Sequence, residues 1–210
     1  MRNIVHESRF IDEREEQFCY FQEQYKIEGC DESLSPSNKY RLKIECYEYR
    51  EGYRRYSYSK GTITDSNEQI VSVINRNYGH FPFLWIEKQD KEYLLCGIDY
   101  QGYTIVDLQS GETESYVPED AYQGLGFCWA AMYHRKNNNR IAVEGCIWAH
   151  EYELIIYHFE DPMQLPYREI MRISPYETFD GWINDMEFKY DKNQVKRINI
   201  NTVEDGPGCN

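Results

Sequence analysis

Apolar and polar residues alternate in several short segments of the chain, most clearly in residues 40–46, which read YRLKIEC. Side chains of a β-strand point alternately to its two faces, so this period of two predicts a strand with one buried face and one face in water. Glu51-Gly52 then provides turn residues, and residues 53–59 are expected to return as the second strand of a hairpin.

The densest apolar and aromatic segment, residues 126–162, divides into three short runs. Residues 127–133, 141–143 and 153–159 are apolar, and the polar residues 136–140 separate the first run from the second. The three Asn of that polar segment suit a turn because Asn tolerates positive φ. Three short apolar runs with turns between them predict antiparallel strands rather than helices.

Similar series of strands and turns recur along the chain. The predicted turns are centred near residues 38, 90, 138 and 193, which are 52, 48 and 55 residues apart. A repeat of about 40 to 50 residues made of short strands is typical of propeller blades. The sequence therefore predicts an all-β fold, a small propeller-like array of about four antiparallel sheets. A β-sandwich or half-open barrel is the alternative, because short and evenly spaced strands fit it as well.

The length of the chain, 210 residues, favours one domain with its own core. We expect residues 1–203 to form a single β-repeat domain that N- and C-terminal strands close into a ring, and residues 204–210 to form a flexible tail. Residues 9–25 leave two alternatives open. The spacing of their apolar side chains fits one face of a helix, but a strand fits about as well and is favoured because the rest of the chain is β.

The charge of the chain limits its partners. It has 36 acidic and 23 basic residues and a net charge of −13. Such a surface repels phosphate backbones and anionic membranes, so nucleic acid and membranes are disfavoured and a protein partner with basic or mixed charge is expected. One basic segment, residues 50–56, is the exception, and a solvated strand pair is its simpler interpretation.

The cysteines and the N-terminal residues indicate a cytoplasmic protein. Seven Cys are irregularly spaced without a CxxC pair, and the first residues do not resemble a signal peptide. No apolar run reaches the roughly 18 residues that a membrane helix needs. We therefore expect reduced, buried cysteines.

Three segments resemble a family of uncharacterised β-repeat proteins found in bacteria, amoebae and giant DNA viruses. They are residues 97–112 (GIDYQGYTIVDLQSGE), 126–133 (GFCWAAMY) and 142–162 (AVEGCIWAHEYELIIYHFEDP), and the resemblance covers about residues 83–173. It implies a fold distantly similar to WD40 propellers, although the Trp-Asp dipeptide of WD40 blades is absent, and it implies no activity. The high Tyr and Asn content favours the viral or amoebal branch, which would place a viral protein in the host cytoplasm.

Cysteine and histidine residues offer a candidate metal site. Cys128, Cys146 and His150, with His134 or His158, could bind zinc from adjacent strands. Their spacing matches no zinc motif, and isolated Cys on apolar strands usually behaves as a small buried side chain. We therefore expect no metal and no cofactor.

Carboxylates and a thiol offer the alternative of an enzyme. Glu144 is the one charged residue in an otherwise apolar strand, and we expect it at the central opening of the ring, with a raised pKa if it is desolvated. Cys128 would need a lowered thiol pKa, which its apolar neighbours do not provide. Asp99 precedes a predicted turn and is expected to bond turn amides. The alternative function is a hydrolase that uses Glu144, Asp99 or Cys128 in a central pocket.

Aromatic residues in loops are the candidates for binding, because aromatic side chains dominate the energetics of protein interfaces. Trp148 is the first of these, since it lies in a loop-like segment after Gly145. The predicted function is a non-enzymatic protein-interaction module or scaffold, a subunit of a multi-protein complex of viral origin. The predicted binding residues are Trp148, His150, Tyr100, Tyr122 and Glu144.

Overall fold

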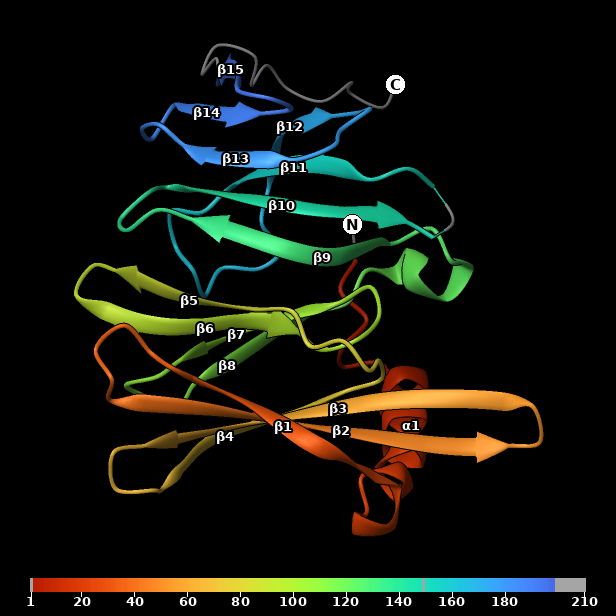
Figure 1. Cartoon of the computed structure of the whole chain (residues 1–210). Coiled ribbons are helices and arrows are strands. Elements are labelled where there is room, and N and C mark those ends of the chain that lie inside the picture. Colours follow the sequence, from red (N-terminus) through yellow and green to blue (C-terminus); the bar gives the residue numbers. More distant parts are fainter. Residues whose placement is uncertain (1, 149, 199–210) are drawn as a thin grey trace.

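The protein is an all-β stack of four antiparallel sheets, none of which closes into a barrel, as a computed structural model that describes residues 2–148 and 150–198 shows (Figure 1). The first sheet contains β1 (Lys26–Leu34), β2 (Tyr40–Glu51), β3 (Arg54–Asp65) and β4 (Ile70–Arg76). The second sheet contains β5 (Phe83–Lys88), β6 (Lys91–Gly97), β7 (Tyr103–Asp107) and β8 (Thr113–Tyr116). The third sheet contains β9 (Phe127–His134), β10 (Arg140–Ile147), β11 (Glu153–His158) and β12 (Glu169–Ile173). The fourth sheet contains β13 (Phe179–Trp182), β14 (Glu187–Tyr190) and β15 (Gln194–Arg197).

Each of the first three sheets is a meander in which neighbouring strands are also consecutive in the chain. The hairpin expected after residues 40–46 is the pair β2–β3, in which Glu51 lies opposite Arg54 and Gly52 takes a positive φ of 59°. Leu42 and Ile44 of β2 are buried against the second sheet, as the alternating pattern predicts. The all-β fold class is therefore confirmed, with the sheets arranged in chain order.

Apolar side chains fill three layers, one between each pair of successive sheets. The second and third sheets contribute to two layers each, because neighbouring residues of their strands point to opposite faces. Leu94 of β6 packs toward the first sheet and Leu95 toward the third. In β10, Val143 packs toward the second sheet and Ala142 toward the fourth. Sheets covered on both faces need continuous apolar strands, and β7 is indeed buried at every residue.

The N-terminal segment is helical, so the strand favoured for residues 9–25 is wrong. The structure has α1 (Ser8–Gln17) followed by two 3₁₀ turns, η1 (Phe18–Tyr20) and η2 (Glu23–Tyr25). Phe10 is the buried residue of α1 and packs against Ile4 and Val117. Ile11 and Phe18, two of the residues whose spacing suggested a helical face, are 41% and 52% exposed, so the helix forms over Ser8–Gln17 without burying that face. None of the helices among the described residues combines the length and apolar character that crossing a membrane requires.

The predicted ring closure has no strand pairing to support it within the described residues. β1, the first strand of the chain, pairs with β2 and so completes the first sheet instead of the fourth. The last sheet also differs from the predicted repeat in the position of its turn. The turn at residues 191–193 has positive φ but joins β14 to β15, whereas the turns near residues 38, 90 and 138 join the first and second strands of their sheets. The predicted tail, residues 204–210, lies outside the described residues.

Candidate functional site

The two ends of the stacked sheets are built from different connections. The turn end, on the left of Figure 1, consists of the tight turns at residues 35–39, 88–91 and 135–140. The loop end, on the right, consists of residues 77–82, 98–102, 117–126 and 148–152. Strands of three sheets end together at each place, so residues that are far apart in the sequence come together there.

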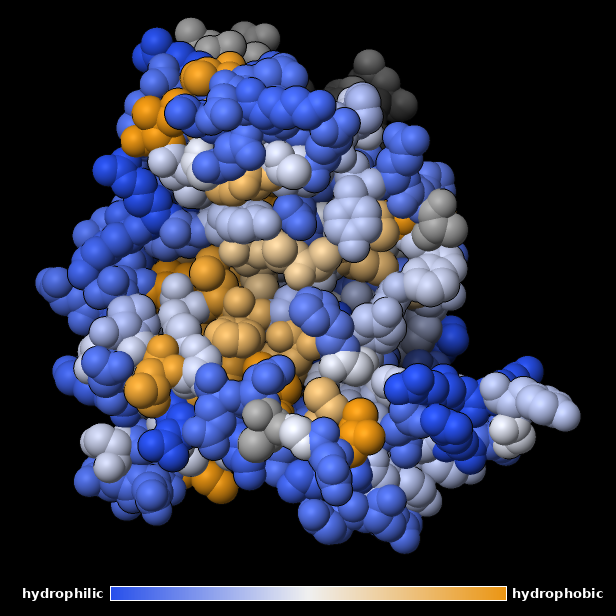
Figure 2. Space-filling view, viewed as in Figure 1, coloured by the Kyte–Doolittle hydropathy of each residue, from blue (hydrophilic) through white to orange (hydrophobic). Residues whose placement is uncertain are grey.

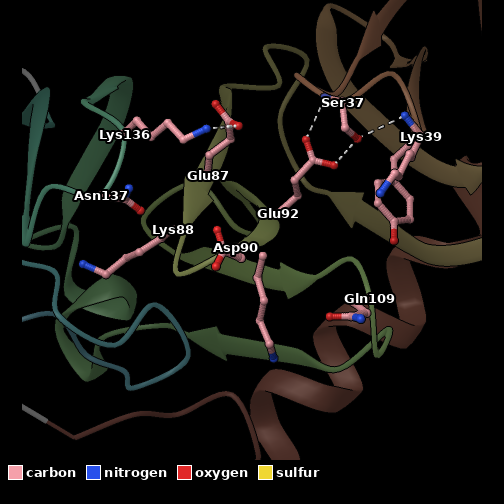
Figure 3. Close-up of a pocket in the computed structure, with 11 residues that line it drawn as sticks. Ser37, Lys39, Glu87, Lys88, Asp90, Glu92, Gln109, Lys136 and Asn137 are labelled. Atoms are coloured by element: carbon pink, nitrogen blue, oxygen red, sulfur yellow. Dashed lines mark hydrogen bonds and ion pairs between the residues drawn. The ribbon is translucent and has the colours of Figure 1, made fainter.

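The turn end holds a pocket of about 310 Å³ that is lined mainly by charged and polar residues (Figure 3). Its charged groups are largely paired with one another or with neighbours. Lys136 Nζ lies 2.7 Å from Glu87 Oε1, and Lys91 Nζ lies 2.7 Å from Asp107 Oδ2. The hydroxyl of Ser37 and its backbone N–H both donate to Glu92. Such pairing leaves little capacity for a ligand.

Lys88 is the most buried of these groups, with 2% of its surface exposed. Its ammonium donates three hydrogen bonds into the third sheet, to Asn138 O (3.0 Å), Asn139 Oδ1 (2.6 Å) and Phe159 O (2.7 Å). Burial lowers the pKa of Lys88. All three ammonium donors are used, so Lys88 fastens the second sheet to the third rather than offering a free charge.

His134 of β9 belongs to the same end. Its Nε2 lies 2.9 Å from Asn138 O, and its ring packs edge-on against Phe159. Burial lowers the pKa of His134 to about 4. The ring is therefore neutral at physiological pH. His134 was also a candidate zinc ligand, but residues 2–148 and 150–198 contain no group of three side chains that could hold a metal ion.

The loop end exposes a group of aromatic side chains, Tyr78, Tyr100, Trp148 and Tyr152, which we call the aromatic rim. The ring of Tyr100 lies between two others, 4.8 Å from the centroid of Tyr78 and 5.3 Å from that of Trp148. Tyr78 is 41% exposed, Tyr152 48% and Trp148 60%. These rings come from three connections, which follow β4, β6 and β10. A surface of exposed aromatic rings is a typical protein-binding feature.

A buried arginine holds the loops beneath the rim. The guanidinium of Arg76, which is 3% exposed, donates to His80 O (2.8 Å) and to Asp99 O (2.6 Å). Burial lowers its pKa to about 10. Gly97 leaves the space that this side chain occupies, because a Cβ there would lie 1.8 Å from Nη1 of Arg76. One side chain thus ties together the loops that carry Tyr78 and Tyr100.

Asp99 and Cys128, both considered for catalysis, lie under the same rim. Asp99 Oδ1 accepts a hydrogen bond from the Tyr100 N–H at 2.6 Å, the turn interaction that the sequence indicates. Cys128 lies directly opposite Cys146 on β9 and β10. Burial raises the pKa of Cys128 to about 11, so its thiol stays protonated at neutral pH.

The five predicted binding residues do not form one group. The structure brings Tyr100 and Trp148 into contact, and His150 lies two residues further along the same loop. Tyr122 packs beneath α1, where the guanidinium of Arg9 lies 3.8 Å from its ring centroid. Glu144 faces the fourth sheet and not a central opening. Its Oε2 accepts hydrogen bonds from Tyr133 (3.0 Å), on the neighbouring strand β9 of the same sheet, and from Tyr176 (2.7 Å), in the segment between β12 and β13.

The sequence reasoning missed a second feature of the loop end, a cavity of about 430 Å³ between the second and third sheets, which we call the aromatic cavity. Trp129 stacks on Tyr103 with centroids 4.1 Å apart, and Tyr157 and Tyr167 extend this stack on either side. Every one of these rings lines the cavity. The sequence signal for this cavity was the concentration of Tyr and Trp on β7, β9 and β11, but from the sequence alone such residues are expected to pack in the core.

Apolar side chains also gather on the face of the molecule shown in Figure 2, over β5 and β9, at the junction of the second and third sheets. The β2–β3 hairpin, which projects on the right of the same view, is hydrophilic by contrast. Its tip carries the basic segment of residues 50–56, where Arg50 and Arg55 both pair with Glu48. This pairing agrees with a solvated strand pair.

Comparison with known proteins finds one viral relative. The chain is 32% identical over 184 residues to an uncharacterised protein, R762, of Acanthamoeba polyphaga mimivirus. The match covers 83% of this chain and 72% of the relative. No family model matches the chain, and no solved structure does.

Proposed function

The chain belongs to the giant-virus protein family that includes mimivirus R762, and we propose that it is a non-enzymatic module that binds a protein partner through the aromatic rim. The observation that carries this proposal is the exposure of Tyr78, Tyr152 and Trp148 at 41%, 48% and 60%. Large aromatic side chains that project from loops on a rigid scaffold are the usual anchors of a protein interface.

Two of the loops of the rim are tied to each other in the protein itself. Arg76 joins the loop of Tyr78 to the loop of Tyr100 through two backbone carbonyl groups. A fixed surface loses less conformational entropy on binding than a mobile one, which favours affinity.

The charge of the chain indicates which partner is suitable. A net charge of −13 favours a partner with basic or mixed charge, and added salt should weaken the association. The relative is a viral protein, and the proposal places this chain in a multi-protein complex in the host cytoplasm. A propeller-like interpretation of the stacked sheets supports a scaffold by analogy of fold alone.

A hydrolase finds less support in the geometry. Glu144, Asp99 and Cys128 line none of the four described cavities. Glu144 is held by two tyrosine hydroxyls, Asp99 by a turn amide, and the Cys128 thiol stays protonated. Catalysis requires such groups to converge on one place where a substrate can sit.

The test is affinity capture from an amoebal lysate with the intact protein and matched variants. We expect wild type to retain a defined partner, and the amount captured should be at least about tenfold lower with Trp148→Ala and with Tyr78→Ala. The amount captured should also fall at higher salt. The control is Tyr53→Ala, which removes an aromatic ring that is fully exposed at the tip of the β2–β3 hairpin and distant from the rim. Equal capture by wild type and both rim variants, or no retained partner, would contradict the proposal.

A further inference from the structure

The aromatic cavity adjoins the aromatic rim at two places. Tyr100 belongs to the rim, and the next residue, Gln101, lines the cavity. In the same way Trp148 belongs to the rim, and Ile147 before it lines the cavity. Consecutive Cα atoms lie only about 3.8 Å apart, so the two features share a border on two separate segments of the chain. One surface of a partner can therefore cover the rim and reach the cavity together.

The cavity is an apolar recess that opens to the surface. Leu125, one of its lining residues, is 57% exposed, and Pro166 is exposed as well. Trp129 and Tyr103 also line it but are only 5% and 4% exposed. The lining thus runs from an exposed edge to buried aromatic rings. Such a recess favours an aromatic ring as its occupant, because aromatic groups stack on one another or meet edge to face.

The charges that line the cavity favour a cation beside that ring. Asp120 forms no ion pair with any other residue in the part of the chain that the structure describes. Arg172 is the one cation among the lining residues, and it pairs with both Glu153 and Glu169. These three side chains together carry a charge of +1 − 2 = −1, so the guanidinium is already neutralised. A basic group of a partner would complement the remaining negative charge.

We propose that the aromatic cavity is the anchor site of the interface, which receives one aromatic side chain of the protein partner. Asp120 pairs with a lysine or arginine that stands next to this side chain in the partner's sequence. The rings of the rim surround the anchor and exclude water from it, which is the arrangement that makes a few buried side chains dominate binding. This inference rests on the proposed function, because it assigns the cavity to the same partner.

Other occupants fit less well. A phosphate or a nucleic acid would face the carboxylates of Asp120 and Glu169, and the nearby guanidinium is already paired. The volume of about 430 Å³ lies at the lower end of the range of ligand sites and suits one large side chain, not an extended segment. A free aromatic molecule would fill the recess but would leave the carboxylate of Asp120 unused, so the experiment includes it as a rival.

The test uses short peptides as probes of the full chain. Their binding is measured by isothermal titration calorimetry at neutral pH. We expect acetyl-Trp-Arg amide to bind saturably with a Kd on the order of 1 mM or tighter, as small ligands do. Acetyl-Ala-Arg amide, which lacks the aromatic anchor, should bind at least about tenfold more weakly. Acetyl-Trp-Glu amide, which reverses the charge, should bind at least about fivefold more weakly.

The variant Asp120→Asn tests the charge pair. It should weaken the binding of acetyl-Trp-Arg amide about threefold to tenfold and should not weaken that of acetyl-Trp-Glu amide, because only the attraction to the basic group is lost. The matched control is Glu119→Gln, a neighbouring carboxylate that does not line the cavity and should have less than about twofold effect.

The variant Leu125→Ala tests the apolar wall and should weaken both tryptophan peptides at least about threefold. Its matched control is Leu34→Ala, because Leu34 is 51% exposed on β1 and lines none of the described cavities. That control should change the affinity by less than about twofold. Leu125 is largely exposed, so the variant should unfold at the same temperature as wild type, and a thermal melt checks this.

The outcomes separate the proposal from its rivals. Equal affinity for the tryptophan and alanine peptides, unchanged affinity in Asp120→Asn, or no saturable binding of acetyl-Trp-Arg amide would each overturn it. If free indole binds as tightly as acetyl-Trp-Arg amide, the occupant is a small aromatic molecule and the anchor proposal is wrong.

The same probes keep this inference apart from the proposed function. Trp148 does not line the cavity, so Trp148→Ala should bind acetyl-Trp-Arg amide within about twofold of wild type while it loses the captured partner. Capture that depends on the rim without any peptide binding would refute the anchor site alone. Peptide binding without capture that depends on the rim would refute the proposed function and leave the cavity as a separate binding site.

Discussion

The turn end and the loop end lie at opposite ends of the same strands of the second and third sheets, yet they differ in which side chains remain available to a partner. At the turn end, the buried ammonium of Lys88 has three acceptors, and the ion pairs of Lys136 and Lys91 are both 2.7 Å long. At the loop end, the rings of Tyr78, Trp148 and Tyr152 are left 41%, 60% and 48% exposed.

This difference separates residues that hold the sheets together from residues that are free to bind a partner, and it does so more reliably than the type of residue does. The pocket at the turn end contains more charged side chains, which would suggest chemistry if residue types alone were counted. Folding has already used those charges to join sheets. The capacity to bind remains where exposed aromatic rings gather, because their apolar surface is still available to a partner.

Replacing Lys88 by Met should have the largest effect at the turn end. The substitution leaves the buried carbonyl groups of Asn138 and Phe159 and the part-buried Oδ1 of Asn139 without a donor, so the free energy of unfolding should fall by about 4 kcal/mol in chemical denaturation. Lys39→Met is the control at an exposed lysine of the same pocket and should change it by less than about 0.5 kcal/mol. A Lys88→Met protein as stable as wild type would show that the polar contacts of the turn end do not hold the second and third sheets together.

The pH dependence of stability should show an intermediate effect, again at the turn end. The folded state lowers the pKa of His134 from 6.5 to about 4, so the unfolded chain binds more protons between these values. Stability is therefore complete above pH 6.5 and decreases as the pH falls toward 4, by up to about 3 kcal/mol.

The variant His134→Gln isolates this contribution, because Gln can still donate to Asn138 O and does not titrate. Its unfolding free energy should vary less than that of wild type between pH 6.5 and 4. Carboxylates such as Glu45, whose pKa the three surrounding lysines lower to about 2, titrate in both proteins, so the difference between the two curves is the quantity to measure. Identical curves would rule out a neutral, buried His134.

The smallest effect on stability is expected at the aromatic rim. Trp148→Ala removes a ring that is 60% exposed and should lower the free energy of unfolding by less than about 0.5 kcal/mol. The matched change Trp129→Ala removes a ring that is 5% exposed within the stack and should cost about 3 to 5 kcal/mol. Similar losses in the two variants would mean that the rim is part of the core and not a free surface.

Much of the fold was predictable because it depends on local patterns. The alternation in residues 40–46 predicts β2 correctly, and the polar residues near 38, 90 and 138 mark three real turns. The N-terminal helix was not predictable with the same certainty, because the apolar spacing within residues 11–25 fits either element, and the buried residue of the helix, Phe10, is identified only by its contacts with Ile4 and Val117. The turn at 191–193 was assigned to the wrong pair of strands, since a turn signal does not state its place in a sheet.

The candidate site was predictable only in part. Exposure of Trp148 follows from its loop, but its contact with Tyr100 joins loops from different sheets, which no local pattern reveals. Glu144 looked functional because it interrupts an apolar strand. Its partner Tyr133 comes from the neighbouring strand β9 and its partner Tyr176 from the segment between β12 and β13, and neither contact can be read from the local sequence of β10. The aromatic cavity was hidden for the same reason, because its lining rings come from strands and loops of two different sheets.

The arrangement of Arg76 beneath Gly97 has a consequence for how this family can diverge. A guanidinium that bonds two loop carbonyls constrains the backbone of those loops without using the side chains at positions 78 and 100. The residues at positions 78 and 100 are then free to vary among relatives, and a virus could change what its protein recognises while keeping the support intact. Comparison of sequences should therefore find the arginine and the glycine more constant than the rings they hold in place.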